Sequence, residues 1–246
     1  MTRIALLSDI HGNAVALDAV LADIATKEVD QIIVLGDIAY RGPEPKRSIE
    51  LVRALNAQVI KGNADEWTVR GVRSGEVGDH VLELMNQERE WIVSHLEDED
   101  LRYLQGLPTE LQLSLTDTLD LYTCHATPES LFEIVLPDQT NDQLEAKMMT
   151  TPSTIYVYAH IHLPYIRYVN GKCLVNTGSV GLPFDGLACS SYVIVEAEGD
   201  RYRVTIERVP YDTGRVIQQY QESDYPNKDV MCEVIRHARS PFIPKK

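Results

Sequence analysis

Carboxylate and imidazole side chains gather at the ends of apolar runs in this sequence. The first apolar run ends in SDIHGN, and later segments read GDIAYRGP, KGNADE, CHATP and AHIHLP. The residues in these segments that could do chemistry are Asp9, His11, Asp37, Arg41, Asn63, Asp65, His125, His160 and His162. Four of the seven histidines fall here, so the histidines are not scattered as surface residues would be.

These residue types suit a metal site. Asp-x-His and His-x-His on an extended segment place both side chains on one side, because the strand period is two. Imidazole with carboxylate and no thiolate favours Mn, Fe, Zn, Co or Ni over a structural zinc. Seven ligand candidates exceed the need of one ion and suit two ions that share a carboxylate.

Each segment also has an ordinary explanation. SDIHGN could be a turn with a helix cap, and Gly-Asp and Gly-Asn are common in turns. Arg41 could be a surface residue beside a Gly-Pro turn, and Asp65 could cap the helix that follows it. The remaining histidines lie on or beside predicted helices, and we expect them to be solvated or helix-terminal; they are His80, His95 and His237. The occurrence of all five segments together favours the metal site.

The first third of the chain predicts alternating strands and helices. Residues 3–7 and 31–37 are apolar enough for buried strands, and residues 57–63 form a third strand. A helix that Asn13 can cap follows the first strand, and residues 45–55 form another. Parallel α/β sheets carry their sites outside the carboxyl ends of the strands, where these polar residues fall.

The remainder predicts antiparallel strands and further helices. Residues 79–106 are helical, with Asp98 as a cap for a short second part. ELQLSL, TLDLYTC and STIYVYAHIH are strand-like, and two hairpins turn at 170–171 and 199–200. Helices are expected near 141–149, 212–222 and 228–238, followed by a loose tail at 240–246. With no repeat or linker, residues 1–246 form a single domain, and we expect 128–153 to cap the site.

Composition limits the partners. A formal net charge of -14 argues against a nucleic-acid groove or an anionic membrane surface as the main partner. No apolar run reaches the roughly 20 residues of a membrane helix, and no signal peptide precedes the first strand, so we expect a cytoplasmic protein. Without a CxxC pair, we expect reduced, packed thiols at Cys124, Cys173, Cys189 and Cys232. The sequence does not indicate the oligomeric state.

The order of the motifs resembles the calcineurin-like metallophosphoesterases. It is most similar to their bacterial and archaeal branch, with SDIHGN, GNxD, HxxP, HxH and NxGSVG in this order, and the resemblance runs from residue 2 to about 196. It implies a four-layer α/β/β/α sandwich of two packed mixed β-sheets, the metallophosphoesterase fold.

The resemblance also implies a role for each matching residue. Asp9, His11 and His162 would bind one divalent metal ion, and Asn63, His125 and His160 a second. Asp37 would bridge the two ions, and a hydroxide between them would attack phosphorus. Arg41 resembles the arginine that holds phosphate in the Ser/Thr phosphatase branch.

The sequence departs from the family pattern where substrates would bind. Many relatives have a histidine after Gly-Asn that helps the leaving group depart, and Ala64 cannot transfer a proton. Poor leaving groups should therefore suffer unless another acid serves, and Asp65 is the next candidate. Leu182 and Phe184 make the mouth of the site more apolar than usual, which favours a nucleoside or aryl group.

We therefore expect a dinuclear metal-dependent phosphoesterase that acts on a small phosphate ester, with phosphodiesters or nucleotides favoured. A phosphomonoesterase or protein phosphatase of the same family is an alternative. A second is a non-catalytic metal-binding scaffold of the same fold, although all seven ligand candidates are present. A third is a metal-dependent hydrolase of non-phosphate esters. Manganese is one candidate metal, and the sequence does not select among the five.

Overall fold

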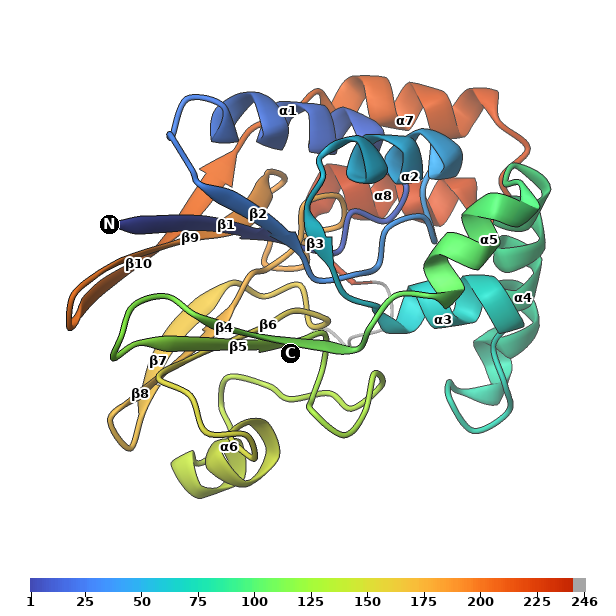
Figure 1. Ribbon diagram of the computed structural model, residues 1–246. Helices are drawn as coiled ribbons and strands as arrows, with labels where there is room; N and C mark the ends of the chain where they lie inside the picture. Colours follow the sequence, from blue (N-terminus) through green and yellow to red (C-terminus); the bar gives the residue numbers. More distant parts are fainter. Residues whose placement is uncertain (241–246) are drawn as a thin grey trace.

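Two five-stranded sheets pack face to face in the computed structural model, which describes residues 1–240 (Figure 1). The expected loose tail therefore lies outside the described residues from 241 onward. The first sheet has the order β10-β9-β1-β2-β3 and the second β4-β5-β6-β8-β7. Both sheets mix parallel and antiparallel pairs, as the sequence predicted.

The bounds of the strands follow. The first sheet holds β1 (Thr2–Leu7), β2 (Gln31–Val34), β3 (Gln58–Val59), β9 (Ser190–Glu198) and β10 (Arg201–Val209). The second holds β4 (Glu110–Ser114), β5 (Asp120–Cys124), β6 (Ile155–Tyr158), β7 (Tyr165–Val169) and β8 (Lys172–Asn176).

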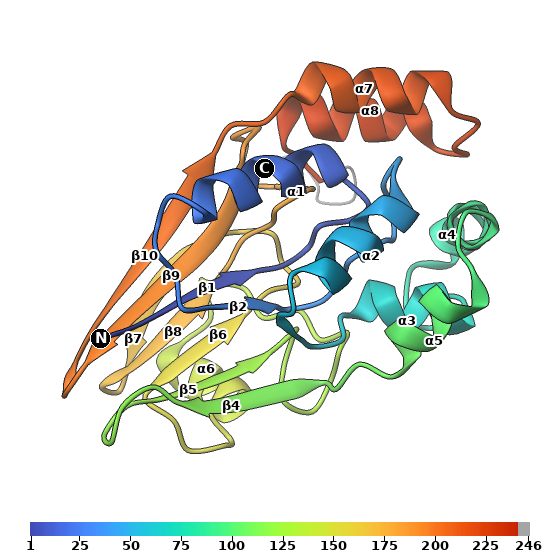
Figure 2. The ribbon, with the colours of Figure 1, turned by 45° about the horizontal axis from the view of Figure 1, so that its top comes forward.

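Helices cover the outer faces of the sheets and so complete four layers (Figures 1 and 2). Over the first sheet lie α1 (Ala14–Ile24), α2 (Pro45–Ala54), α7 (Thr213–Glu222) and α8 (Lys228–His237). Beside the second sheet lies α6 (Asn141–Met148), and at the end of the sandwich lie α3 (Asn63–Arg70), α4 (Asp79–Ser94) and α5 (Asp98–Gln105). No helix within residues 1–240 combines the length and apolarity needed to cross a membrane.

Strand β1 shows why the sheets stack. Ile4 and Leu6 point into the core between the two sheets, whereas Ala5 and Leu7 point into the core beneath the helices. The alternation of the strand therefore supplies both layers, as expected for a run that is apolar on both faces. A third cluster, which includes Cys124, packs α6 onto the outer face of the second sheet. All four cysteines are free and buried, as the sequence predicted.

The β-α-β-α-β start of the chain sets the carboxyl ends of its strands side by side. Strand β1 pairs in parallel with β2, and β2 with β3. Asn13 caps α1 by accepting a hydrogen bond from the N–H of Ala16.

Several predicted boundaries in this half of the chain were wrong. Strand β2 ends at Val34 and not at residue 37. Strand β3 has only two residues, and the chain then turns so that Asn63 begins α3. Glu97 rather than Asp98 precedes α5, because Asp100 closes that end by accepting from the N–H of Glu97.

Two glycines let the ends of β2 and β3 touch. Gly36 has a φ of +83°, and a Cβ added there would lie 2.2 Å from the backbone nitrogen of Gly62. A Cβ at Gly62 would lie 2.1 Å from Oδ1 of Asp37. The Gly-Asp and Gly-Asn motifs therefore each need their glycine for close backbone approach.

We expect Gly36→Ala to destabilise the protein by more than the cost of placing an alanine at a positive φ, because the added Cβ would also collide with the backbone of Gly62. Gly171 has nearly the same φ, +84°, but a Cβ there would meet nothing within 4 Å, so Gly171→Ala is a matched control. Overpacking at Gly36 should cost about 2 kcal/mol more than the control. Chemical denaturation with a chelator present measures both, and equal losses would contradict the close approach.

Candidate metal centre

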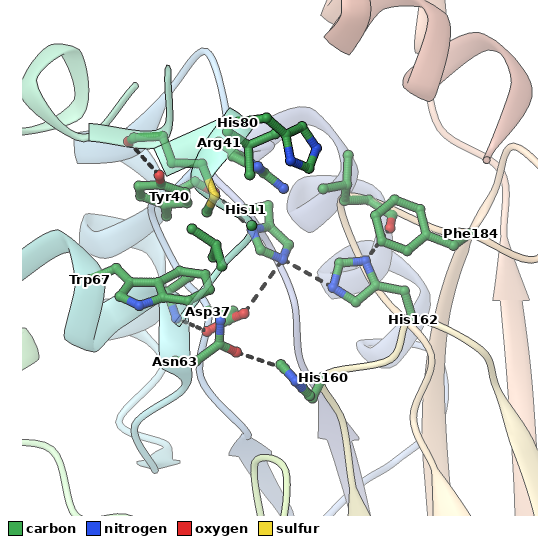
Figure 3. Close-up of a pocket in the computed structure, with 16 residues that line it drawn as sticks. His11, Asp37, Tyr40, Arg41, Asn63, Trp67, His80, His160, His162 and Phe184 are labelled. Carbon is green, nitrogen blue, oxygen red and sulfur yellow. Dashed lines mark hydrogen bonds and ion pairs between the residues drawn. The ribbon is translucent and has the colours of Figure 1, made fainter. Parts of the chain in front are cut away.

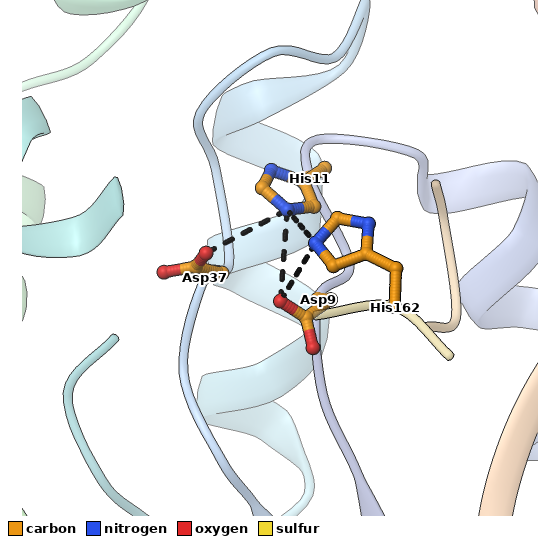
Figure 4. A group of neighbouring side chains, drawn as sticks. All are labelled: Asp9, His11, Asp37 and His162. Carbon is orange, nitrogen blue, oxygen red and sulfur yellow. Dashed lines mark hydrogen bonds and ion pairs between the residues drawn. The ribbon is translucent and has the colours of Figure 1, made fainter. Parts of the chain in front are cut away.

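Four buried side chains from three segments of the chain converge on one point. Asp9, His11, Asp37 and His162 each offer one ligand atom, and these atoms all lie within 4.8 Å of one another (Figure 4). Nε2 of His162 lies 3.1 Å from Oδ1 of Asp9, and Nε2 of His11 lies 3.7 Å from the same oxygen. The sequence motifs at residues 9–11 and 162, far apart in the chain, therefore share one site.

The other three predicted ligands meet beside this cluster. Oδ1 of Asn63 lies 2.9 Å from Nε2 of His125 and 2.7 Å from Nδ1 of His160. Oδ2 of Asp37 lies 3.4 Å from Nε2 of His125 and 3.6 Å from Nε2 of His11. Asp37 is thus the residue that faces both groups.

Backbone carbonyls fix the orientation of three of the histidines. Nδ1 of His11 lies 2.8 Å from the carbonyl of Tyr40, and Nδ1 of His125 and His162 lie 2.6 and 2.5 Å from those of Leu35 and Leu182. With Nδ1–H donating to a carbonyl, Nε2 is the atom left to bind a metal. This arrangement is the usual support of a metal-binding histidine.

Two features of the first cluster fit a cation. Nε2 of His11 and Nε2 of His162 face each other at 3.2 Å, which brings two lone pairs together when both Nδ1 atoms carry the proton. Oδ1 of Asp9 is buried without a hydrogen-bond partner among the described residues. A buried carboxylate oxygen needs a donor or a cation, so the donor set fits a divalent metal.

The charges of the site also favour a bound cation. Burial acts to raise the pKa of Asp9 and of Asp37, but the neighbouring histidines lower both below the ordinary value, so both carboxylates are ionised. Burial lowers the pKa of His160, with help from His125, to about 4, which leaves His160 neutral. Burial also acts against the charged form of His125, yet Asp37 and Asp9 raise its pKa to about 10. The two carboxylates therefore attract positive charge beside them.

The backbone of the site is strained. Asp9, His11, Asp37, His160 and His162 all have positive φ, between 49° and 69°. Residues other than glycine rarely adopt this conformation, and such strain persists where the surrounding structure enforces it. Here the N–H groups of Asp9 and His11 donate to the carbonyls of Gly36 and Asp37, which ties the two strand ends together. The turns aim the ligands at a cost that tertiary contacts offset.

The loop at 176–181, which carries the NxGSVG motif, supports the end of the first strand. The hydroxyl of Ser179 and the N–H of Gly181 both donate to the carbonyl of Asp9. The N–H of Val180 donates to the carbonyl of Ser8. These donors are engaged by backbone, so the loop holds Asp9 in place.

Asp65 lies beneath the site. Its Oδ2 accepts hydrogen bonds from the N–H groups of Asp37 and Gly62, and its Oδ1 accepts from that of Ile38. The side chain is fully buried and does not line the pocket. Burial and the charge of Asp37 raise the pKa of Asp65 to about 7 against the effect of these donors. These contacts match the capping role that was one of the two predictions for Asp65. The side chain caps the start of α3 at Gly62 and also binds the turn at Asp37.

We expect Asp65→Asn to loosen the turn that carries Asp37. An asparagine keeps one acceptor oxygen but turns an NH2 group toward backbone N–H groups, which should cost about 1–3 kcal/mol of unfolding free energy. Metal affinity should fall by about tenfold, as is usual when a ligand loses its support. Denaturation and metal titration measure the two effects, with the exposed Asp98→Asn as control. Values equal to those of the control would contradict the supporting role.

Arg41 lies at one side of the site with a buried partner. Nε of Arg41 lies 3.1 Å from Oε2 of Glu88, whose side chain is fully buried. Oε1 of Glu88 accepts from the side-chain amide of Asn227, and the hydroxyl of Tyr220 donates to the carbonyl of Arg41. The charge of Glu88 raises the pKa of Arg41 against the effect of burial, so the guanidinium stays protonated.

A pocket of about 520 Å³ opens onto these groups (Figure 3). Its polar lining includes the predicted residues His11, Asp37, Arg41, Asn63, His160 and His162. Its apolar lining comes from Tyr40, Ala64, Trp67, Val77, Val81, Met85, Leu182 and Phe184. Phe184 stacks on His162 with ring centroids 4.3 Å apart, so the apolar mouth expected from Leu182 and Phe184 forms beside a ligand.

The wall of the pocket differs from the expected cap. No described residue of 128–153 lines the pocket; Phe132 only packs behind Trp67, with ring centroids 5.6 Å apart. The start of α4 and the preceding loop form this wall, with Gly78 and His80 among the lining residues. His80 is exposed, as expected, but it faces the site. Neither the position of His80 nor the buried charge of Glu88 was predicted from the sequence.

The chain thus combines two five-stranded mixed sheets with a buried Asp-His-Asp-His cluster at the strand ends. The chain belongs to the calcineurin-like phosphoesterase superfamily, whose domain profile matches residues 2–200. The family predicted from the motif order is therefore confirmed.

The chain is also similar to two relatives and to one solved structure. The uncharacterized protein MJ0912 of Methanocaldococcus jannaschii is 29% identical, and the match covers 92% of this chain and 94% of that protein. A symmetrical bis(5'-nucleosyl)-tetraphosphatase of Pectobacterium carotovorum is 29% identical over 132 residues, covering 50% of this chain and 43% of that protein. The crystal structure of a metallophosphoesterase from Sphaerobacter thermophilus has a TM-score of 0.77 at 26% identity and covers 96% and 99% of the two chains.

Proposed function

We propose that this protein is a dinuclear metal-dependent phosphoesterase. One ion would be held by Asp9, His11 and His162, and the other by Asn63, His125 and His160, with Asp37 shared between them. Two divalent cations so held would supply an activated water and offset the charge of the ester. The family, the cluster of Asp9, His11, Asp37 and His162, and the contacts that join the other three predicted ligands beside it support this proposal. The ionised carboxylates support it as well.

The position of Asp37 is the observation that supports a site for two ions rather than one. Its Oδ2 lies 3.4 Å from a nitrogen of the second group and 3.6 Å from a nitrogen of the first. Carboxylates that face two ligand groups at once are the usual bridge of a two-metal site.

We propose further that phosphodiesters or nucleotides are the preferred substrates. The pocket joins an ionic floor to an apolar wall that includes Trp67 and Phe184, which suits an ester with an aryl or nucleoside group. Arg41 would bind phosphate oxygens where the ionic floor of the pocket meets its apolar wall. The partial similarity to a nucleosyl-tetraphosphatase supports a nucleotide substrate. The four cysteines are free and buried, which supports a cytoplasmic location.

The test pairs metal content with rate. The protein is stripped with a chelator, and Mn, Fe, Zn, Co or Ni is added back singly. Hydrolysis of bis-p-nitrophenyl phosphate is compared with that of p-nitrophenyl phosphate and p-nitrophenyl acetate. We expect about two ions per chain, metal-dependent hydrolysis and a preference for the diester.

Each alternative gives a different result in this assay. A preference for the monoester would support a phosphomonoesterase or protein phosphatase and contradict the proposed substrate class. Hydrolysis of the acetate alone would support a hydrolase of other esters. Bound metal without turnover of any ester would support the non-catalytic scaffold.

A further inference from the structure

Three ionisable side chains of the pocket have no part in the proposed metal site. Among the described lining residues, Tyr40, Arg41 and His80 can carry a transferable proton without being predicted ligands. The hydroxyl of Tyr40 donates to the carbonyl of Met85, and burial raises the pKa of Tyr40 well above its ordinary value. Arg41 stays protonated beside Glu88. His80 is left as the lining side chain whose imidazole can both hold and release a proton.

The imidazole of His80 is seated at the mouth of the pocket. His80 is the second residue of α4, and a Cβ added at Gly78 would lie 2.8 Å from Cε1 and 2.9 Å from Nδ1 of its ring. The ring of His80 therefore packs against Gly78, where any larger residue would collide with it. Figure 3 shows His80 and Arg41 at one end of the view and Asn63 and His160 at the other.

We propose that His80 is the general acid that protonates the leaving group. This role rests on the proposed phosphoesterase function, and it is the one that Ala64 cannot take. A water oxygen forms the new bond to phosphorus while the bond from phosphorus to the leaving oxygen breaks. The proton of the His80 imidazolium passes to the leaving oxygen, and the proton released by the attacking water passes to solvent, from which His80 regains one.

The layout of the pocket favours this direction of proton flow. In an in-line displacement the leaving oxygen departs on the side opposite to the attacking water. The predicted ligands Asp37 and His162 are buried and line the floor of the pocket, whereas His80 is an exposed lining residue at its mouth. A leaving group that points away from the floor therefore points toward the end of the pocket that carries His80.

The test compares two aromatic diesters that differ in leaving group. Bis-p-nitrophenyl phosphate releases a stable phenolate that needs no proton, whereas dibenzyl phosphate releases an alkoxide that does. The rates of His80→Ala and His80→Gln are measured on both with the metal that best activates the wild type. His237→Gln, another exposed helical histidine outside the pocket, is the control.

We expect both His80 variants to lose about 10²-fold in kcat on dibenzyl phosphate and less than about threefold on the nitrophenyl ester. Glutamine can donate a hydrogen bond but cannot transfer a proton, so full activity of His80→Gln beside a loss in His80→Ala would overturn the proposal. Equal losses on both esters, or no loss on either, would also overturn it. These results leave the proposed function standing. Failure of the wild type on both esters with every metal would overturn the two together.

Discussion

Asp37→Asn should leave a folded protein that hydrolyses phosphate esters at least about 10³-fold more slowly. The substitution keeps the shape of the side chain but removes the one carboxylate that faces both ligand groups. Oδ1 of Asp37 also accepts a hydrogen bond from the N–H of Ala64, which an asparagine oxygen can still do. The loss should therefore come from metal binding and not from the turn.

Metal content distinguishes this explanation from misfolding. Elemental analysis after chelation and add-back should give fewer ions per chain for Asp37→Asn than for the wild type, with unchanged circular dichroism. His162→Ala and His160→Ala, which touch one group each, should each bind about one ion fewer. An Asp37→Asn protein with full metal content and full rate would contradict the shared carboxylate.

The predicted ligands illustrate how much of a site a sequence can specify. Strand period and the common edge of parallel strands bring Asp9, Asp37 and Asn63 together, because β1, β2 and β3 are neighbours in register. His125 and His160 follow β5 and β6, which are also parallel neighbours. The motifs fall at strand ends, so the order of the strands in each sheet largely determines which motifs lie close together.

The pocket wall could not be predicted in the same way. Its residues on α4 depend on how a helix outside both sheets docks, and no local pattern encodes that angle. One signal was present, because Glu88 lies on the buried face of α4 with Met85 and Ile92. A carboxylate among apolar positions at helical spacing indicates a buried charge with a partner. The partner, Arg41, lies 47 residues earlier in a turn with a φ of 71°, which sequence spacing does not reveal.

Arg41→Gln should lower kcat/KM for phosphate esters by about 10²-fold, the usual effect of removing one donor to a developing charge. The variant alone is ambiguous, because it leaves the carboxylate of Glu88 buried without its cation. That change should cost about 3–5 kcal/mol of unfolding free energy by itself. Lower activity could then reflect a damaged pocket.

The double variant Arg41→Gln/Glu88→Gln resolves this ambiguity. It removes both charges, keeps Oε1 of residue 88 as an acceptor for Asn227 and leaves two amides that can pair. The unfolding free energy should return to within about 1 kcal/mol of the wild type. The loss in kcat/KM should remain, since the phosphate has still lost its guanidinium. If activity returns with stability, Arg41 serves only to neutralise Glu88, and phosphate binding must depend on the metal ions alone.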